Sequence, residues 1–374
     1  MNRNEALFSL IRRLETEHRL ERSEYEFLLA NRTPEAAARL ADSAVRLRRE
    51  IYGNDVYIRG LIEISSFCRN DCLYCGIRRS NSRCQRYRLT PEEILECCRE
   101  GYELGFRTFV LQGGEDGWFQ DGRLCKLIGR IRSAYPDCAV TLSLGERSRE
   151  SYQRLFDAGA ERYLLRHETA SRAHYEKLHP EEMSYDSRMR CLRDLKEIGY
   201  QTGCGFMVGS PGQTAENLLA DLEFIARFQP QMVGIGPFIP HRDTPLGAFA
   251  AGTVELTLKL LAIIRLLLPN VLLPATTALA TLDARGCEKG MLAGANVVMP
   301  NLSPAQAREK YALYEGKATA AGETANALSD LRRRMESIGY RVAVARGDHR
   351  SSTDGEGILT RKKGEHDPCT TPNP

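Results

Sequence analysis

Residues 62–80 read IEISSFCRNDCLYCGIRRS, and both the fold and the chemistry of the chain are organised around them. The segment begins with an apolar run, which predicts a β-strand. It continues into three cysteines within eight residues, Cys68, Cys72 and Cys75. A cubane iron–sulfur cluster has four irons, and each takes one outside ligand, most often a cysteine thiolate. Three cysteines therefore leave one iron open to bind and activate a small molecule.

Two other kinds of site also use closely spaced cysteines. A closed zinc site needs a fourth protein ligand, as does a cluster that only transfers electrons, and Cys84 stands nine residues after Cys75. The spacing C-x3-C-x2-C, with Tyr74 directly before the third cysteine, resembles the cysteine loop of the radical S-adenosylmethionine (SAM) enzymes. The role of Cys84 stays open at this point.

The composition, 42% hydrophobic and 27% charged residues, is typical of a soluble globular protein, and 374 residues hold one large barrel or two ordinary domains. The net charge of +3 is too small to predict binding to nucleic acid or to an anionic membrane. The longest apolar stretch, near 256–275, is broken by Lys259, Arg265 and two prolines, and the N-terminus has no secretory signal. The twelve cysteines then indicate reduced thiols in a cytoplasmic protein.

The hydrophobic pattern of the chain changes at about residue 56. Residues 1–55 show helical periodicity and predict an N-terminal helical extension. From 56 to 315, β-rich runs alternate with helical patterns, and the strand candidates begin at residues 57, 108, 139, 162, 201, 232, 271 and 296. Eight such units over about 255 residues predict a complete (β/α)8 TIM barrel. An open doubly wound sheet is compatible with the same alternation.

The C-terminal part divides in two. Residues 316–345 predict one more helix and a short strand that pack on the barrel. Residues 346–374 are polar and almost free of large apolar side chains, so they cannot bury enough surface to fold. We expect a disordered tail there.

In such a barrel, catalytic residues lie at the C-terminal ends of the strands. The second strand candidate ends in Gly113, Gly114 and Glu115. Paired glycines let the backbone come close to a ligand, and the carboxylate is an acceptor for the SAM amine. This resembles the GGE element of radical SAM enzymes. Thr141 and Ser143 lie two apart on the third strand, and we expect both to point into the barrel.

Other polar residues follow the fourth and seventh strand candidates. Glu168 is a candidate acceptor for ribose hydroxyls or the amine, and Thr276 and Thr277 are candidate donors to an anionic substrate. His167 fits a packed or hydrogen-bonded histidine better than a ligand. The pattern around Arg188 predicts a solvated helix arginine, although this residue is also a candidate partner of the SAM carboxylate.

Longer strings extend the resemblance beyond the cysteine loop. They are CRNDCLYCGIRRSN, RYRLTPEEI, LQGGED, VTLSLGE, YLLRHETA, MVGSPGQT, QMVGIGPFIPHRDTPL, PATTAL and GANVVMPN. In this order and spacing, from about residue 57 to about residue 316, they resemble the HydE family, the radical SAM maturases of FeFe hydrogenase. Biotin synthase and methylornithine synthase belong to the same broader group.

The resemblance implies roles for individual residues. Cys68, Cys72 and Cys75 would hold a 4Fe–4S cluster whose fourth iron binds SAM, with Glu115 beside them as a catalytic residue. The SAM pocket would be lined by Tyr74, near the adenosine, and by Gln112, Gly113, Gly114, Glu115, Thr141, Ser143, Glu168 and Arg188. The substrate and anion sites inside the barrel would be bordered by Arg166, Thr276, Thr277, Tyr311 and Tyr314.

The resemblance also implies a substrate and partners. The substrate would be a cysteine-bound iron carbonyl cyanide complex made by a partner radical SAM maturase. The deoxyadenosyl group would attack the sulfur of this complex, on the way to the diiron subcluster of the H-cluster, which is delivered to a scaffold GTPase. The electron for SAM cleavage would come from a reductant such as ferredoxin or flavodoxin.

One departure from the family is clear. Some members carry a second cluster on cysteines after the segment that reads YALYEGK here, but this chain continues KATAAGETANALSD. We therefore predict no auxiliary cluster. The strands offer only Cys204, which argues against biotin synthase with its second cluster inside the barrel. Three alternatives remain: a related barrel that acts on a carbon substrate, as methylornithine synthase does, a cluster-binding scaffold without SAM turnover, and a zinc protein.

Overall fold

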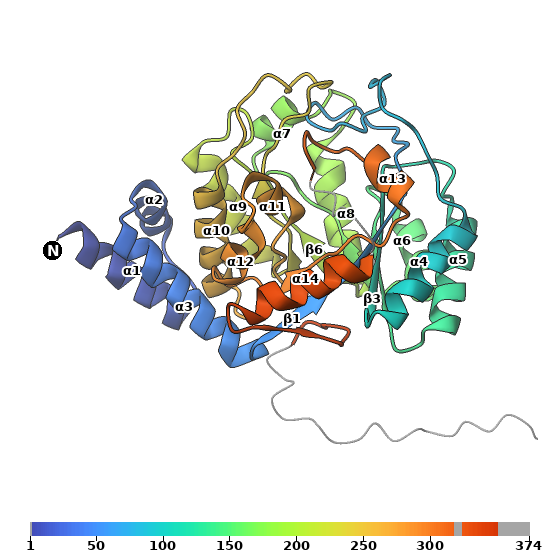
Figure 1. Ribbon diagram of the computed structural model, residues 1–374. Coiled ribbons are helices and arrows are strands. Elements are labelled where there is room, and N and C mark those ends of the chain that lie inside the picture. Colours follow the sequence, from blue (N-terminus) through green and yellow to red (C-terminus); the bar gives the residue numbers. More distant parts are fainter. Residues whose placement is uncertain (1, 318–323, 351–374) are drawn as a thin grey trace, which may run out of the picture.

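The computed structural model describes residues 2–317 and 324–350. The chain begins with three helices, α1 (Arg3–Glu17), α2 (Arg22–Ala30) and α3 (Pro34–Tyr52). α3 begins where the sequence indicates, because the Thr33 side chain accepts a hydrogen bond from Ala36 N and Pro34 takes the first helical position. α1 and α3 pack against α10 (Val254–Leu267), at one side of the molecule (Figure 1).

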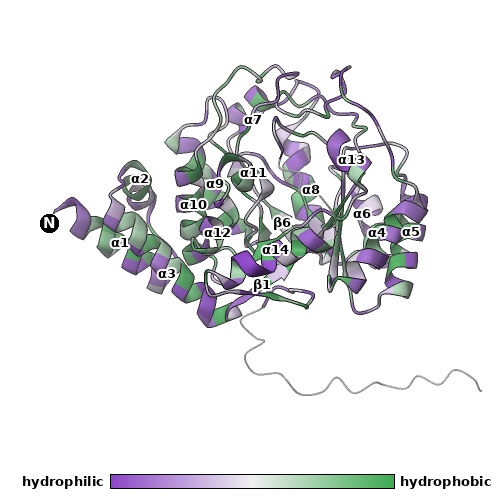
Figure 2. Cartoon of the chain, in the orientation of Figure 1, coloured by the Kyte–Doolittle hydropathy of each residue, from purple (hydrophilic) through white to green (hydrophobic). Residues whose placement is uncertain are grey.

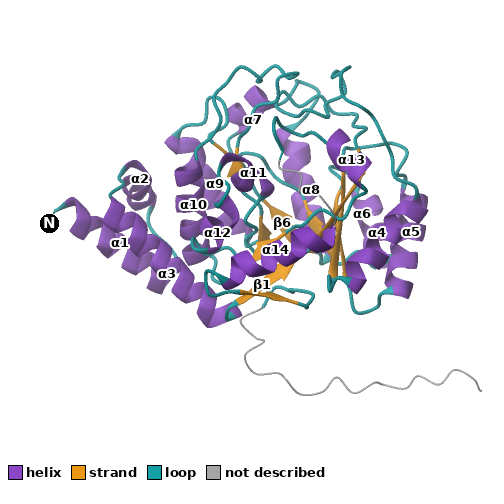
Figure 3. Cartoon of the chain, in the orientation of Figure 1, coloured by secondary structure: helices purple, strands orange, loops and turns teal. Residues whose placement is uncertain are grey.

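The centre of the molecule is a parallel sheet of six strands in the order β2-β3-β4-β5-β6-β8. These strands are β2 (Gly60–Ser65), β3 (Thr108–Gly113), β4 (Ala139–Ser143), β5 (Arg162–Leu164), β6 (Gln201–Cys204) and β8 (Met232–Val233). The helices between and after them are α4 (Pro91–Glu103), α5 (Asp121–Ala134), α6 (Arg149–Asp157), α7 (Arg172–Leu178), α8 (Tyr185–Ile198) and α9 (Ala215–Phe228). Helices surround the strands (Figure 3), which confirms the α/β class with a parallel sheet.

Shorter pairings continue from the two edges of this sheet. Parallel bridges join Met232 to Leu272, Pro274 to Val297, and Asn301 to Leu61 of β2. β7 (Met207–Val208) pairs with β9 (Gly236–Pro237), and β10 (Val297–Val298) pairs with β1 (Asp55–Ile58). The strand expected from residue 271 is interrupted, because α11 (Thr277–Leu282) begins inside it, and α12 (Gly286–Met291) follows. That part of the strand prediction was wrong.

Alternate residues of a strand face opposite sides of the sheet. Ile62 and Ile64 of β2, like Phe109 and Leu111 of β3, are fully buried in the main hydrophobic cluster. The covering helices carry both hydrophobic and hydrophilic residues (Figure 2), as amphipathic helices on a core do. The alternate residues Glu63, Val110 and Gln112 face the other side of the sheet.

The C-terminal part contains α13 (Ala305–Lys310), α14 (Thr324–Glu336) and β11 (Arg341–Ala343), and β11 pairs with β1. Asp348 lies 2.5 Å from Arg162 at the start of β5, and the carbonyl of Arg346 accepts a hydrogen bond of 2.7 Å from Thr108. The expected disordered tail was therefore placed too early: residues 346–350 bind at the N-terminal ends of the strands. The rest of that prediction, residues 351–374, lies outside the described residues. Among the described helices, none is both long and apolar enough to span a membrane.

Candidate functional site

The cysteine loop lies over the C-terminal ends of the strands. Backbone hydrogen bonds attach it to several distant segments. Arg69 N donates to Glu115 O after β3, Leu73 N donates to Leu178 O at the end of α7, and Gly76 N donates to Leu313 O, over 3.0, 3.0 and 2.8 Å. The loop is thus attached to the end of β3, to the end of α7 and to the segment around residue 313.

The three loop cysteines are unpaired and partly exposed. Burial raises the pKa of the Cys72 thiol well above its usual range, and Cys75 and Cys68 raise it further. Burial and then Cys68 raise the pKa of Cys75 to about 12. The mutual effect of the three thiols on their pKa values indicates that they are close neighbours. Within 2–317 and 324–350, no three His, Cys, Asp or Glu side chains already stand in metal-ligating positions.

Gly114 brings the end of β3 into direct contact with the cysteine loop. A Cβ added at Gly114 would lie 2.7 Å from Cys68 Cβ and 2.2 Å from Phe67 O, so only glycine fits there. The next residue, Glu115, is almost buried, with 8% of its side chain exposed. Its carboxylate accepts hydrogen bonds from Arg69 Nε and from Glu146 N, over 2.9 and 2.8 Å. The GGE element is thus placed beside the first loop cysteine.

Below the loop, polar atoms are buried without hydrogen-bond partners. They are Thr141 Oγ1, Arg166 Nε and Nη2, Glu168 Oε2 and Thr276 Oγ1. Arg166 Nη2 and Glu168 Oε2 lie 3.2 Å apart, an ion pair whose angles are not those of a hydrogen bond. Gln112 of β3 is in register with Ser143 of β4, so these two polar residues are neighbours on adjoining strands. Buried polar groups in folded proteins are nearly always paired, so these atoms indicate a ligand or water.

Glu168 has a left-handed backbone, with φ of 65°. This conformation is costly for a residue with a side chain, and such residues cluster at functional sites. The neighbouring His167 holds the backbone in place: its Nδ1 accepts from Gly205 N over 3.2 Å, and its Nε2 lies 3.2 Å from Asp221 Oδ1. His167 and Asp221 are fully buried. His167 is thus a hydrogen-bonded structural residue, which the sequence favoured.

Arg188 is buried, and the pattern-based expectation of a solvated helix arginine was wrong. Its Nε lies 2.7 Å from Glu146 Oε1, and its Nη1 donates to Arg166 O over 2.6 Å. Only 7% of the side chain is exposed. Arg188 therefore connects α8 to the ends of β4 and β5, next to the unpartnered atoms.

Tyr74 is half-buried within the loop. Its hydroxyl lies 3.3 Å from His179 Nε2, and the two rings make an edge-to-face contact. Burial and the charge of Arg188 lower the pKa of His179 to about 3, so that this imidazole is neutral near pH 7. The Tyr74 ring therefore lies against an uncharged wall.

The structure adds two charged residues that the sequence interpretation missed. Glu63 of β2 is fully buried and accepts a hydrogen bond of 2.9 Å from Asn301 Nδ2. It also pairs with Lys317, whose Nζ donates to Tyr311 O over 2.9 Å. The only signal in the sequence was a carboxylate in the middle of the apolar run LIEIS.

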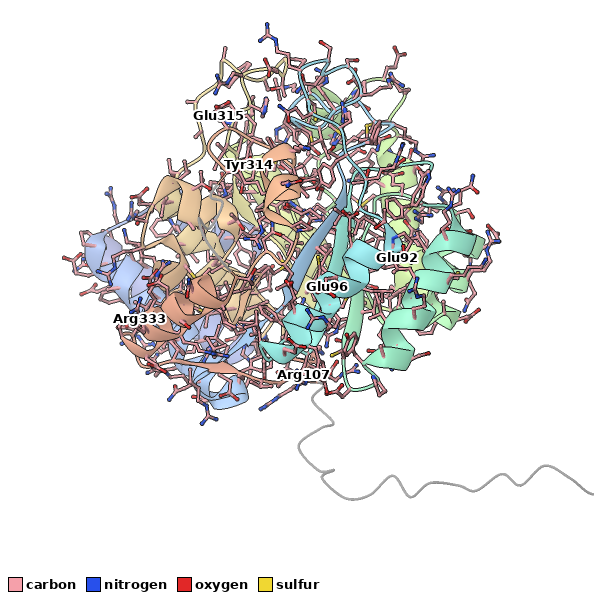
Figure 4. All side chains as sticks on the ribbon, turned by 45° about the vertical axis from the view of Figure 1, so that its right-hand side comes forward. Glu92, Glu96, Arg107, Tyr314, Glu315 and Arg333 are labelled. Carbon is pink, nitrogen blue, oxygen red and sulfur yellow. The ribbon has the colours of Figure 1, made fainter. Side chains whose placement is uncertain are left out.

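The remaining predicted residues lie in the segments above the strands. Tyr311 is buried, and Gln112 makes a side-chain hydrogen bond to it. Burial raises the pKa of Tyr314 to about 12. Figure 4 shows Tyr314 and Glu315 together toward the upper end of the molecule. Thr277 is the first residue of α11, directly after Thr276.

Comparisons with known proteins find relatives that match most of this chain. Residues 62–225 match the model of the radical SAM superfamily. The FeFe hydrogenase maturase subunit HydE of Thermotoga maritima is 49% identical over 283 residues, which cover 76% of this chain and 80% of that protein. The 3-methylornithine synthase of Methanosarcina barkeri is 29% identical, over 84% of this chain and 88% of its own. The crystal structure of methylornithine synthase (PylB) superposes with a TM-score of 0.78 and 26% identity, over 94% of this chain and 100% of that one.

Proposed function

This chain belongs to the HydE family of FeFe hydrogenase maturases, within the radical SAM superfamily, and we propose which of its residues perform the family's reaction. It is a radical SAM enzyme of H-cluster assembly. The observation that carries the residue assignment is the group of buried polar atoms without partners below the cysteine loop, contributed by Thr141, Arg166, Glu168 and Thr276.

Membership of the superfamily implies a 4Fe–4S cluster and SAM as cofactors. We assign the cluster to Cys68, Cys72 and Cys75, with no auxiliary cluster. The donor set fits, because three neighbouring thiols leave one of four irons for SAM, and Gly114 leaves no room for a side chain behind Cys68. When bound and reduced, by a donor such as ferredoxin or flavodoxin, the cluster supplies the electron that splits SAM into methionine and a deoxyadenosyl radical.

We assign SAM binding to residues from the ends of β3, β4 and β5, from helix α8 and from the loop. Glu115 accepts the SAM amine, and Gly113 and Gly114 let the backbone approach the methionine part closely. Arg188, held by Glu146, faces the carboxylate. Glu168 Oε2 accepts from the ribose. Polar contacts and the adenine wall come from Gln112, Thr141, Ser143 and Tyr74.

We assign the substrate to the space bordered by Arg166 and Thr276. Arg166 Nε and Thr276 Oγ1 are donors without partners, which suits an anionic ligand. A cysteine-bound iron carbonyl cyanide complex, supplied by a partner radical SAM maturase, has this charge, and the product would pass to a scaffold GTPase. Thr277, Tyr311 and Tyr314 complete the border.

We also infer that the fold closes into a complete (β/α)8 barrel over residues 56–315. The parallel bridges at Leu272, Pro274 and Asn301 support this closure, since they continue the six-stranded sheet from β8 back to β2. Residues 1–55 then form a helical extension, and 316–345 a helix and strand that pack on the barrel. The eleven described cysteines are free thiols, which supports a reducing, cytoplasmic setting.

The test is activation of FeFe hydrogenase in an anaerobic extract that lacks its own HydE maturase. Reconstituted wild type, Cys72→Ser and Cys125→Ser are added back separately. Cys125 lies on α5, outside the loop, so its variant controls for the loss of any thiol. We expect hydrogen evolution with wild type and Cys125→Ser only.

Two outcomes would contradict parts of this proposal. Activation by Cys72→Ser would overturn the cluster assignment. SAM cleavage by wild type without hydrogenase activation would move the substrate to a carbon skeleton, the alternative that the similarity to methylornithine synthase favours.

A further inference from the structure

One arginine, Arg86, joins the two ends of the cysteine loop. It stands eleven residues after Cys75. Its Nη1 donates to the carbonyl of Ser66, before the first cysteine, and to that of Ile77, after the third, the latter over 2.7 Å. Its Nη2 donates to Arg78 O over 2.6 Å and to Asn81 O over 3.3 Å.

The main chain beside Arg86 follows the end of β2. Ser66 N donates to Tyr87 O over 3.2 Å, Tyr87 N donates to Ser66 Oγ over 2.9 Å, and Leu89 N donates to Ile64 O over 2.9 Å. The main chain that carries Arg86 is therefore hydrogen-bonded to the end of β2. Because its main chain is fixed in this way, the Arg86 guanidinium can hold the cysteine loop in place relative to the strands.

Asp71 makes a second set of hydrogen bonds, within the cysteine loop itself. Its carboxylate accepts from Arg78 Nε over 2.7 Å and from the backbone and hydroxyl of Ser80 over 3.0 and 2.6 Å. Asn81 Nδ2 donates to Gly76 O over 2.7 Å. These bonds fold the segment from Asp71 to Asn81, but they do not connect it to residue 66. Only Arg86 donates to carbonyls on both sides of the three cysteines among the described residues.

We infer that Arg86 is a positioning residue that holds Cys68, Cys72 and Cys75 in a cluster-ready arrangement before the cluster is inserted. This inference rests on the proposed function. It depends on the shape of the guanidinium, because five N–H donors in a planar fork can bind four carbonyls at once. A lysine ammonium carries the same charge, but it is a compact group on a flexible stem and cannot bridge them.

The test compares three full-length variants with the wild type: Arg86→Lys, Arg86→Met and the control Arg107→Met. Arg107 also donates to two backbone carbonyls, those of Tyr102 and Phe106. It lies at the opposite end of the molecule from Tyr314 (Figure 4), so its variant reports the general cost of losing such an arginine. Melting temperatures of all four proteins measure that cost.

The first readout is iron retained against a chelator after anaerobic reconstitution. Residues that orient metal ligands typically contribute roughly ten- to a hundredfold in metal affinity. We expect a loss of that size in both Arg86 variants and none in Arg107→Met. The second readout is trypsin cleavage of cluster-free protein after Arg79 and Arg83, whose side chains are 59% and 78% exposed. Cleavage should be faster in both Arg86 variants only.

Several results would overturn the inference. Wild-type iron retention by Arg86→Lys would show that charge, and not shape, is what matters. Equal iron loss in Arg107→Met would show that the iron loss in the Arg86 variants reflects only a lower stability of the fold. If Arg86→Met does not fold, Arg86→Lys carries the test alone. A wild type that binds no iron would overturn the proposed function as well, whereas normal iron binding in all variants would overturn this inference only.

Discussion

Replacement of Gly114 by alanine is expected to separate the cysteine loop from the end of β3. The added Cβ would lie 2.2 Å from Phe67 O and 2.7 Å from Cys68 Cβ. Non-bonded carbon atoms pack best at about 3.5–4.0 Å, so the Phe67–Cys68 backbone must retreat by roughly 1 Å. Overpacking of this kind costs about 1–3 kcal/mol of folding free energy. A misplacement of about 1 Å in a reacting site costs about a hundredfold in rate.

The assay is deoxyadenosine formation by reconstituted protein, together with iron content and the melting temperature. Gly117→Ala is the matched control, because a Cβ at Gly117 meets nothing within 4 Å. We expect Gly117→Ala to behave as wild type, and Gly114→Ala to stay folded but lose most SAM cleavage. Wild-type turnover in Gly114→Ala would show that the contact between GGE and the loop has no role in the reaction.

Three further predictions concern the polar groups below the loop. Glu168→Gly and Glu168→Ala should both lose SAM cleavage. In urea unfolding, the glycine variant should be about 1 kcal/mol more stable than the alanine variant, because only glycine adopts a φ of 65° without strain. Equal stability of the two variants would show that the backbone of Glu168 is not strained. Lys317→Met should cost about 3–5 kcal/mol in the same measurement, since it leaves Glu63 buried and unpaired, and adding Glu63→Gln should restore much of it. The lowered pKa of His179, about 3, stabilises the folded state above the unfolded pKa of about 6.5, and this stability is lost as pH falls from 6.5 toward 3. The wild-type melting temperature should therefore fall more steeply over that range than that of His179→Gln.

Features encoded within a few consecutive residues could be predicted from the sequence. The spacing of Cys68, Cys72 and Cys75 defines the loop by itself, and a glycine pair ahead of Glu115 indicates a close backbone approach. The β-rich apolar runs predict the strands of the six-stranded sheet, because parallel strands are buried on both faces. The caps of α3 follow from Thr33 and Pro34 in the same local way.

Features that depend on contacts between distant parts of the chain could not be predicted from the sequence. Arg188 has the local pattern of an exposed helix residue, and only the distant Glu146 explains its burial. The sequence does not indicate a role for Glu63, because its partner Lys317 lies far along the chain. The tail was placed too early because Asp348 has no apolar neighbour in sequence, yet it pairs with the fully buried Arg162. Charge pairing between distant segments can order a polar stretch that composition alone predicts to be disordered.

Three kinds of feature near the C-terminal ends of the strands cost stability. Thr141, Arg166 and Thr276 bury donors without acceptors, Glu168 keeps a left-handed backbone, and Glu63 and Lys317 place an ion pair out of water. Each costs on the order of 1–3 kcal/mol unless something compensates it. Next to Glu168, the fully buried His167 binds Asp221 and Gly205 N, and Gly205 O in turn accepts a hydrogen bond from Glu168 N. A fold selected for stability alone would place apolar side chains at these positions, so their polarity is best explained by the SAM and the substrate that we propose they bind.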